Sequence, residues 1–166
     1  MIADSGLPLI SVVKACCEAG LEGLEWAYGI PGTLGGAVYG NAGAFGHETK
    51  EFVKNVRLLK EDIEMIEIPN EKMGFGYRSS ILKDKTIKGT ILRIEMELKY
   101  GDPVAIKEKM EEIIARRRVV HPEGKGSLGS VFRNPSGYYA GKLIEECGLK
   151  GKTIGKVRIS ETHGNT

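Results

Sequence analysis

The sequence predicts an α+β fold, in which helices and antiparallel strands follow one another without a regular strand–helix–strand alternation. One run of residues alternates strictly between apolar and charged side chains, two other β-like runs are joined by a turn, and apolar residues recur elsewhere at helical spacing. The 166 residues, 41% hydrophobic and 28% charged, suffice to bury a core as one domain or two small ones.

The first element expected is a helix near the N-terminus. Pro8 is tolerable in its first turn, and Gly20 is well placed to end it. Four apolar residues recur at helical spacing and are expected to form its buried face: Leu7, Ile10, Val13 and Cys17.

Three strands are expected next. Residues 53–60 and 63–68 are short β-like runs, and Glu61-Asp62 between them suits a hairpin turn. Residues 92–99 form the clearest strand, because Leu, Ile, Met and Leu alternate there with Arg, Glu, Glu and Lys. One face of this strand is therefore expected to be apolar and the other charged.

A second helix is expected to begin at Pro103. Asp102 has the form of an N-cap, and proline suits the first helical position. Apolar residues continue at helical spacing up to three consecutive arginines, residues 116–118. A second domain is expected to begin with this helix, which divides the chain into residues 1–101 and 102–166.

The remaining elements are shorter. Residues 121–129 are rich in glycine and proline and are expected to form a loop. A third helix is expected behind Ser136-Gly137 and should end at Gly148. Residues 156–160 are expected to form a short strand.

Charge and cysteine usage exclude several classes of protein. A net charge of +2 is too small to indicate a nucleic-acid or anionic-membrane partner, and no apolar run approaches the roughly 20 residues needed to span a bilayer. Cys16, Cys17 and Cys147 have neither a metal-ligand spacing nor a disulfide pattern. We therefore expect no metal site, and three small core thiols in a reducing cytoplasm.

Glycine is concentrated in residues 29–37, Gly-Ile-Pro-Gly-Thr-Leu-Gly-Gly-Ala, and again in residues 41–46, Asn-Ala-Gly-Ala-Phe-Gly. Such clusters are tolerated where the backbone needs positive φ angles or approaches another group closely. Successive backbone N–H groups in such a turn can form a concave array of donors for a diphosphate. A tight structural loop without a ligand explains the same spacing equally well.

Polar residues stand in three further segments where packing does not demand them: residues 76–80, 129–135 and 160–165. Each segment alone has an ordinary explanation. Arg78 suits a surface ion pair, and Ser130 suits a cap within a turn.

In combination, and in this order, these segments resemble the UDP-N-acetylenolpyruvoylglucosamine reductase family, the UDP-N-acetylmuramate dehydrogenases of bacterial cell-wall synthesis. Residues 23–25, Gly-Leu-Glu, with the two glycine-rich stretches behind them, resemble the family's FAD-binding segment. Residues 77–80, Tyr-Arg-Ser-Ser, resemble its substrate-carboxylate segment. Residues 129–135, Gly-Ser-Val-Phe-Arg-Asn-Pro, resemble its proton-donor loop.

The resemblance implies a cytoplasmic flavoenzyme of peptidoglycan precursor synthesis, in which NADPH reduces a bound FAD and hydride then passes to the enolpyruvyl group of a UDP-sugar. It implies an FAD-binding α+β domain over residues 1–101 and a partial α+β substrate-binding domain over residues 102–166. The FAD contacts that it implies are Gly29, Ile30, Pro31, Gly32, Thr33, Gly35, Gly36, Asn41, Ala42 and Gly43.

Two residues carry the chemistry that the resemblance implies. Hydride addition pushes electron density toward the substrate carboxylate, so the guanidinium of Arg78 suits stabilisation of the developing enolate. Ser130 matches the family's proton donor, and a neutral hydroxyl can protonate so strong a base. The substrate contacts implied are Tyr77, Asn134 and Arg118, with Arg117 as an open alternative to Arg118.

The sequence departs from the family's pattern at both ends. Nothing matches the small first subdomain that clasps FAD, and no glutamate matches the catalytic glutamate near the family's C-terminus, so we expect a chain truncated at both ends. The alternative is a non-catalytic nucleotide-binding or assembly module, and a related FAD-linked oxidase ranks below it. A homo-oligomer would cover the truncated edges.

Overall fold

A computed structural model describes residues 1–120, 126, 127 and 129–166, and it confirms the α+β fold. The chain divides into two compact units, Met1–Ile114 and Ala115–Thr166. Helix α3 (Pro103–Val120) runs across this division. The loop expected at residues 121–129 lies for the most part outside the described residues. The domain boundary expected after residue 101 stays a prediction.

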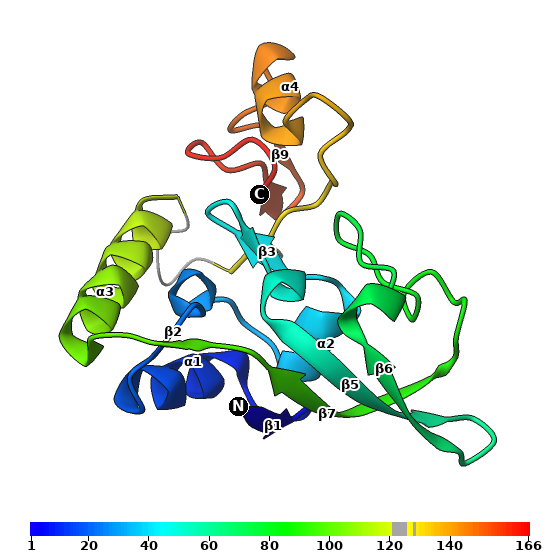
Figure 1. Ribbon diagram of the computed structural model, residues 1–166. Coiled ribbons are helices and arrows are strands. Elements are labelled where there is room, and N and C mark those ends of the chain that lie inside the picture. The colour runs from blue at the N-terminus through cyan, green and yellow to red at the C-terminus, as the bar shows by residue number, and fades with distance from the viewer. Residues whose placement is uncertain (121–125, 128) are drawn as a thin grey trace. The chain divides into compact units, whose positions relative to one another are not determined.

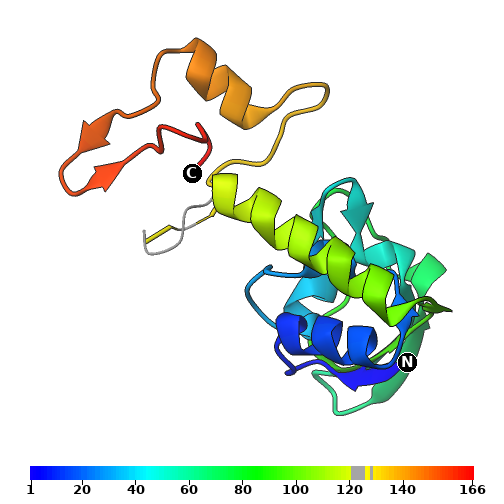
Figure 2. The ribbon, with the colours of Figure 1, turned by 90° about the vertical axis from the view of Figure 1, so that its left-hand side faces the viewer.

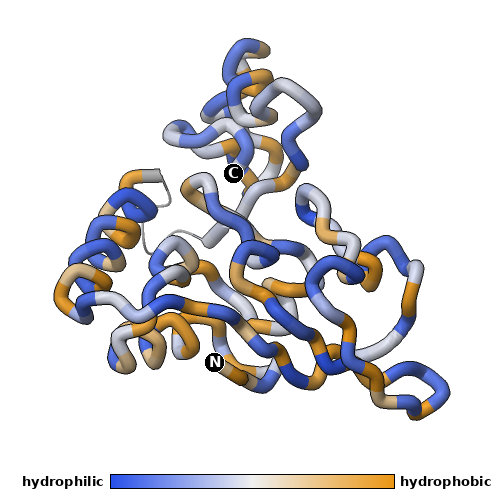
Figure 3. The backbone as a smooth tube through the Cα atoms, viewed as in Figure 1, coloured by the Kyte–Doolittle hydropathy of each residue, from blue (hydrophilic) through white to orange (hydrophobic). Residues whose placement is uncertain are grey.

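The first unit is built on a four-stranded antiparallel sheet in the order β1-β7-β5-β6 (Figure 1). Strand β5 (Val53–Lys60) pairs with β6 (Met65–Pro69) on one side and with β7 (Gly89–Met96) on the other. The hairpin and the alternating strand are thus confirmed. Hydrophobic and hydrophilic residues alternate along β5 and β7 (Figure 3), and Ile94 in the middle of β7 is completely buried.

Strand β1 (Ile2–Asp4) was not expected from the sequence. It pairs antiparallel with β7, so that Ala3 lies opposite Ile94, and the N-terminal ammonium donates to the Met96 carbonyl at 2.8 Å. A run of three residues is too short to show a period of two. The pairing comes from the free edge of β7 rather than from local pattern.

Helix α1 (Leu9–Glu18) confirms the expected helix but only part of its buried face. The residues buried on α1 are Leu9, Val12, Val13 and Cys16. Of the four residues expected on this face, Val13 is buried and Cys17 half-buried, whereas Ile10 is exposed and Leu7 is exposed outside the helix, which starts only after the extended Pro8. The helix ends as expected, since Gly20 takes the positive φ of 65° that a helix terminus favours.

The first turns of α3 lie beside α1 (Figure 2), where Gly20 approaches the Pro103 ring. Asp102 Oδ1 accepts from the Val104 N–H at 3.0 Å, which confirms the expected cap, and Ile106 and Met110 are buried.

Short elements complete the unit: β2 (Leu21–Glu22), η1 (Glu25–Ala27), α2 (Leu34–Tyr39), β3 (Gly43–Ala44), β4 (His47–Glu48), η2 (Thr49–Glu51), η3 (Asn70–Lys72) and β8 (Lys99–Tyr100).

The second unit contains α4 (Ala140–Glu146) and a hairpin of β9 (Thr153–Ile154) and β10 (Val157–Arg158). The third expected helix is therefore confirmed, and Gly148 behind it has a φ of 67°. The expected strand at residues 156–160 shrinks to the two residues of β10.

The three cysteines are free thiols, but they are not all core residues. Cys16 is buried, Cys17 is half-buried and Cys147 is exposed. Burial raises the pKa of the Cys16 thiol to about 11, so this group stays protonated at neutral pH. None of the helices within the described residues combines the length and the apolar character that crossing a membrane requires.

The sheet core provides a test of the fold. Ile94→Ala removes a completely buried side chain, so we expect the free energy of unfolding to fall by about 2–5 kcal/mol in urea denaturation. Ile2→Ala is the matched control, because Ile2 lies in the same sheet and is 65% exposed. A loss as large in Ile2→Ala would contradict the described core.

Candidate functional site

The turn formed by residues 29–33 is half-buried at Gly29 and Ile30 and exposed from Pro31 to Thr33, and several of its backbone N–H groups are unpaired among the described residues. Gly29 and Gly32 have φ angles of 84° and 110°, and a Cβ on Gly32 would meet nothing within 4 Å. The N–H of Ile30 donates to the Ala27 carbonyl at 3.0 Å. Among the described residues, the N–H groups of Gly29, Gly32 and Thr33 have no acceptor. This turn therefore holds three backbone donors that no described residue satisfies, with open space over Gly32.

The glycines that follow have a different cause. The Gly35 N–H donates to the Ser5 carbonyl at 2.8 Å, and a Cβ on Gly35 would lie 2.8 Å from Ser5 Cβ. Thr33 caps α2 by accepting from the Gly36 N–H at 3.1 Å. Gly35 is therefore required by packing against the segment before α1. The structural explanation thus accounts for part of the cluster, and a ligand at the turn of residues 29–33 stays a prediction.

Arg78 lies in a tight turn on the same unit. Gly76 and Ser79 exchange two backbone hydrogen bonds of 3.2 and 3.1 Å, which leaves Tyr77 and Arg78 as the two residues of the turn. Arg78 has a φ of 54°, a conformation that costs a non-glycine residue about 1–3 kcal/mol. Phe45, Ile63 and Lys85 also have positive φ angles, so the strain alone does not mark Arg78 as functional, and its role in catalysis stays a prediction.

The Arg78 side chain reaches back to the glycine-rich residues 41–43. Its Nη2 donates to the Gly43 carbonyl at 2.5 Å and its Nη1 to the Asn41 carbonyl at 3.3 Å. The guanidinium carbon lies 5.0 Å from the centre of the Tyr77 ring, within cation–π range. Residues 41–43 and 77–78, both singled out in the sequence, are thus brought together around one cation.

Gly43 makes this contact sterically feasible. A Cβ on Gly43 would lie 2.8 Å from Arg78 Nη1 and 2.6 Å from the His47 carbonyl oxygen. Any larger residue at position 43 must therefore displace the guanidinium or the backbone of β4.

Asn41 is completely buried, and its side chain is fully hydrogen-bonded within the unit. Nδ2 donates to Glu48 Oε2 at 3.1 Å and to the Gly76 carbonyl at 2.9 Å, and Oδ1 accepts from the Lys50 N–H at 3.0 Å. A cofactor contact by Asn41 stays a prediction. What the bonds show is that this side chain ties the glycine-rich stretch to the turn of Arg78.

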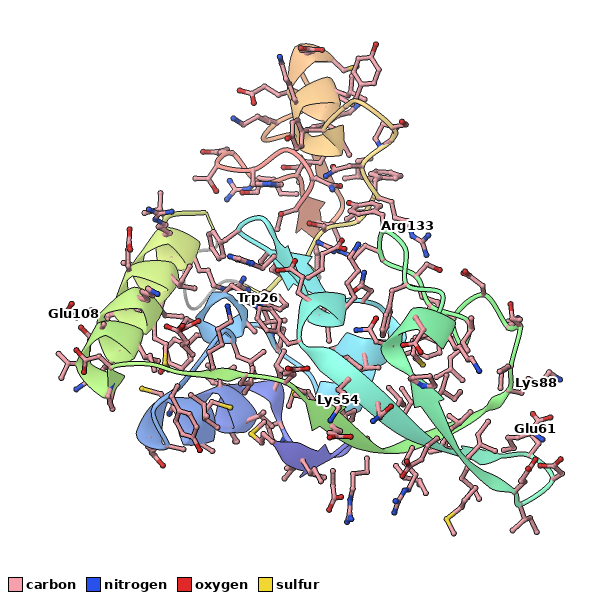
Figure 4. The ribbon with its side chains drawn as sticks, in the orientation of Figure 1. Trp26, Lys54, Glu61, Lys88, Glu108 and Arg133 are labelled. Atoms are coloured by element: carbon pink, nitrogen blue, oxygen red, sulfur yellow. The ribbon has the colours of Figure 1, made fainter. Side chains whose placement is uncertain are left out.

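Two residues near these segments, Glu48 and Trp26, were missed in the sequence, and Glu25 was singled out only as the last residue of the stretch 23–25. Glu48 Oε1 lies 3.6 Å from Arg78 Nη1. Glu25 Oε1 and Trp26 Nε1 are buried without a partner among the described residues, on the short helix η1 that directly precedes the glycine-rich turn (Figure 4). Nothing in the local sequence separates Glu48 and Trp26 from ordinary surface and core residues.

In the second unit, Ser130 and Asn134 line a hollow of about 340 Å³ with residues of α4 and the C-terminal segment. Ser130 is exposed, and Asn134 Oδ1 accepts from the Ala140 N–H at the start of α4 at 3.0 Å. The side chains of Lys142 and His163 also line this hollow.

Asn165 holds the segment that carries Ser130. Its Oδ1 accepts from the Phe132 N–H at 2.9 Å, and its Nδ2 donates to the Phe132 carbonyl at 2.8 Å. The Asn165 carbonyl also accepts from the Val131 N–H at 3.1 Å, and only 4% of Asn165 is exposed. The buried side-chain amide of Asn165 thus satisfies the backbone N–H and carbonyl of Phe132, as a neighbouring strand would, and so holds the segment that carries Ser130.

Arg117 and Arg118, the two candidates for a basic substrate contact, both lie in the last turn of α3. Burial lowers the pKa of the Arg117 guanidinium from its ordinary value, although an arginine remains charged at any relevant pH. Arg118 is exposed. The assignment of the substrate contact to Arg118 stays a prediction.

Comparison with known proteins decides the family. Residues 1–68 match the model of an FAD binding domain, and residues 121–166 match the model of the UDP-N-acetylenolpyruvoylglucosamine reductase C-terminal domain. A UDP-N-acetylenolpyruvoylglucosamine reductase from Caldanaerobacter subterraneus is 45% identical over 163 residues, which are 98% of this chain and 53% of that protein. The chain belongs to the UDP-N-acetylenolpyruvoylglucosamine reductase family.

Two further relatives agree. The reductase of the same name from Clostridioides difficile is 46% identical over 164 residues, which cover 98% of this chain and 53% of that protein. The crystal structure of the UDP-N-acetylenolpyruvylglucosamine reductase from Thermus caldophilus superposes with a TM-score of 0.87 at 36% identity, over 99% of this chain and 60% of that one. The chain thus spans about half the length of the curated relatives that it matches.

The packing of Arg78 on Gly43 leads to a prediction. We expect Gly43→Ala to lower the free energy of unfolding by about 1–3 kcal/mol and to displace the guanidinium, because the new methyl overlaps both Arg78 and the His47 carbonyl. Urea denaturation measures the first effect and a crystal structure of the variant the second. Gly6→Ala is the control, since a Cβ there meets nothing within 4 Å. An unmoved Arg78 would contradict the described packing.

Proposed function

We propose that this chain binds FAD and a UDP-sugar and acts in the NADPH-dependent reduction of UDP-N-acetylglucosamine enolpyruvate to UDP-N-acetylmuramate, a step of peptidoglycan precursor synthesis. The observation that carries the proposal is the pairing of a donor-rich, exposed glycine turn with a strained, clamped arginine in one unit. The family of the chain supports it, because the relatives matched are reductases of this name.

The residues present fit FAD. The turn at residues 29–33 offers three N–H groups without an acceptor among the described residues, beside open space over Gly32. Such an array suits a diphosphate, because backbone N–H groups can bind the phosphate oxygens without a lysine or an arginine. Residues 1–68 carry the matched FAD binding domain. When bound, FAD supplies the hydride for the reaction.

Arg78 is proposed to hold the substrate carboxylate. Its Nη atoms are engaged by the carbonyls of Asn41 and Gly43, whereas no described residue accepts from Nε–H. Nε–H and the remaining N–H of Nη2 form the edge that can donate two parallel hydrogen bonds to the two oxygens of a carboxylate. A guanidinium fixed in this way stabilises the negative charge that develops on the enolate during hydride addition.

Ser130 is proposed to donate the proton that completes the reduction, and Asn134 and Arg118 to contact the UDP-sugar. The hydroxyl of Ser130 is exposed on the hollow of the second unit, on a segment that Asn165 holds by backbone hydrogen bonds. An enolate carbon is basic enough to take a proton from a neutral hydroxyl held close to it. Three free thiols favour a reducing cytoplasm as the location.

A non-catalytic nucleotide-binding module is the second candidate, and it shares the glycine turn. The clamped Arg78 favours the reductase, because a module that only binds a nucleotide has no need for a strained cation. No described feature supports self-association, which is not part of the proposal.

The diphosphate site can be tested by binding. We expect FAD to bind the purified chain with a shift of the flavin absorbance bands, and riboflavin, which lacks phosphates, to bind at least about ten-fold more weakly. Titrations followed by absorbance and fluorescence measure both affinities. Equal affinities would contradict a role of the glycine turn in phosphate binding.

The role of Ser130 can be tested in the two half-reactions of the FAD-loaded chain. In Ser130→Ala we expect flavin reduction by NADPH to be unchanged and reoxidation by the enolpyruvyl UDP-sugar to slow by about 10²–10⁴-fold, because only the second step consumes the proton. Anaerobic stopped-flow absorbance measures both rates. Ser136→Ala, an exposed serine of the same segment, is the control. Equal losses in both half-reactions would contradict the assignment.

A further inference from the structure

Glu48 lies at the centre of the contacts that hold Arg78. Its Oε1 is 3.6 Å from Arg78 Nη1, and its Oε2 accepts from Asn41 Nδ2 at 3.1 Å and pairs with Lys50 Nζ at 2.9 Å. Only 21% of the Glu48 side chain is exposed. The carboxylate is thus fixed on one side by a buried amide and a lysine, and faces the guanidinium on the other.

This carboxylate contributes what the two carbonyls cannot. A neutral carbonyl orients one N–H at a time, whereas a carboxylate attracts the guanidinium as a whole and limits the rotamers of a long side chain. Arg78 is also strained at φ 54° and has a third of its side chain exposed. Without a fixed counter-charge, an arginine on so short a turn has several other conformations within reach.

The engaged atoms show which edge of the guanidinium remains for a ligand. Nη1 forms the ion pair with Glu48 and donates to the Asn41 carbonyl, and Nη2 donates to the Gly43 carbonyl. Nε–H is left without an acceptor among the described residues. The contact with Glu48 therefore lies away from the Nε edge and does not compete with a carboxylate bound there.

We propose that Glu48 is a positioning residue, whose carboxylate fixes Arg78 so that the Nε edge of the guanidinium stays presented to the carboxylate of the substrate. This inference rests on the role proposed for Arg78 in reduction. Glu48 acts through Arg78 and does not touch the substrate.

Glu48 also belongs to a capping box with Glu51, which supplies a matched control. Glu51 Oε1 accepts from the Glu48 N–H at 2.7 Å, and no contact joins Glu51 to Arg78 among the described residues. Glu48→Gln and Glu51→Gln both perturb the capping box. Only Glu48→Gln removes the charge opposite the guanidinium.

The first measurement needs no activity. In ¹⁵N NMR spectra of the full chain, the Arg78 guanidinium resonances, assigned by their loss in Arg78→Lys, are expected to show restricted rotation in the unmodified chain and in Glu51→Gln. They are expected to average or broaden in Glu48→Gln. Unchanged Arg78 resonances in Glu48→Gln, or equal changes in both variants, would overturn the proposal.

The second measurement uses the FAD-loaded chain. We expect Glu48→Gln to slow reoxidation by the enolpyruvyl UDP-sugar about ten-fold at saturating substrate, and to leave reduction by NADPH within about two-fold. In an Arg78→Lys background the Glu48→Gln change should have little further effect, because the group through which it acts is gone. Full additivity would overturn the proposal. No reoxidation by the unmodified chain would instead refute the proposed function, and the NMR result would still decide the role of Glu48.

Discussion

The candidate site depends on one arrangement, the anchoring of the Arg78 guanidinium on the carbonyls of Asn41 and Gly43. This contact joins a tight turn to a glycine-rich stretch that lies 35 to 37 residues earlier in the chain. It explains several residue choices at once. Gly43 leaves room for the guanidinium, Asn41 ties its own backbone to Gly76, and Tyr77 covers one face of the cation. With the carboxylate of Glu48 proposed to fix it further, a cation held in this way keeps its direction in the absence of ligand.

The elements with a long, regular pattern were predictable from the sequence. The alternation over residues 92–99 predicts the second half of β7, which ends at Met96, and the cap at Asp102 begins α3, because both signals are local. The buried face of α1 was predicted only in part. Val13 is buried as expected, but two overlapping sets of apolar residues stand at helical spacing, and the local pattern does not show that the set with Leu9, Val12 and Cys16 faces the core. Strand β1 escaped prediction because it depends on a partner 90 residues away in sequence and not on its own composition.

Several residues of the candidate site were predictable from the sequence, but the hydrogen bonds and ion pairs between them were not. Motif resemblance singled out Arg78 and the glycine-rich residues. Nothing in the local sequence shows that the Asn41 side chain is hydrogen-bonded within the protein or that Glu48 faces the guanidinium. Asn165 is a similar case. Its amide pairs with the backbone of Phe132, 33 residues earlier, and so supports the segment of Ser130. Contacts over such separations are set by the tertiary fold, which a pattern of neighbours does not encode.

The left-handed backbone of Arg78 places stability and chemistry in opposition at one position. A glycine there would relax the turn and release the chain from holding a long side chain still, so selection for heat resistance alone favours loss of the arginine. Under the role proposed for Arg78, any melting temperature that an engineered form of this chain gains through glycine at position 78 comes with a loss of turnover.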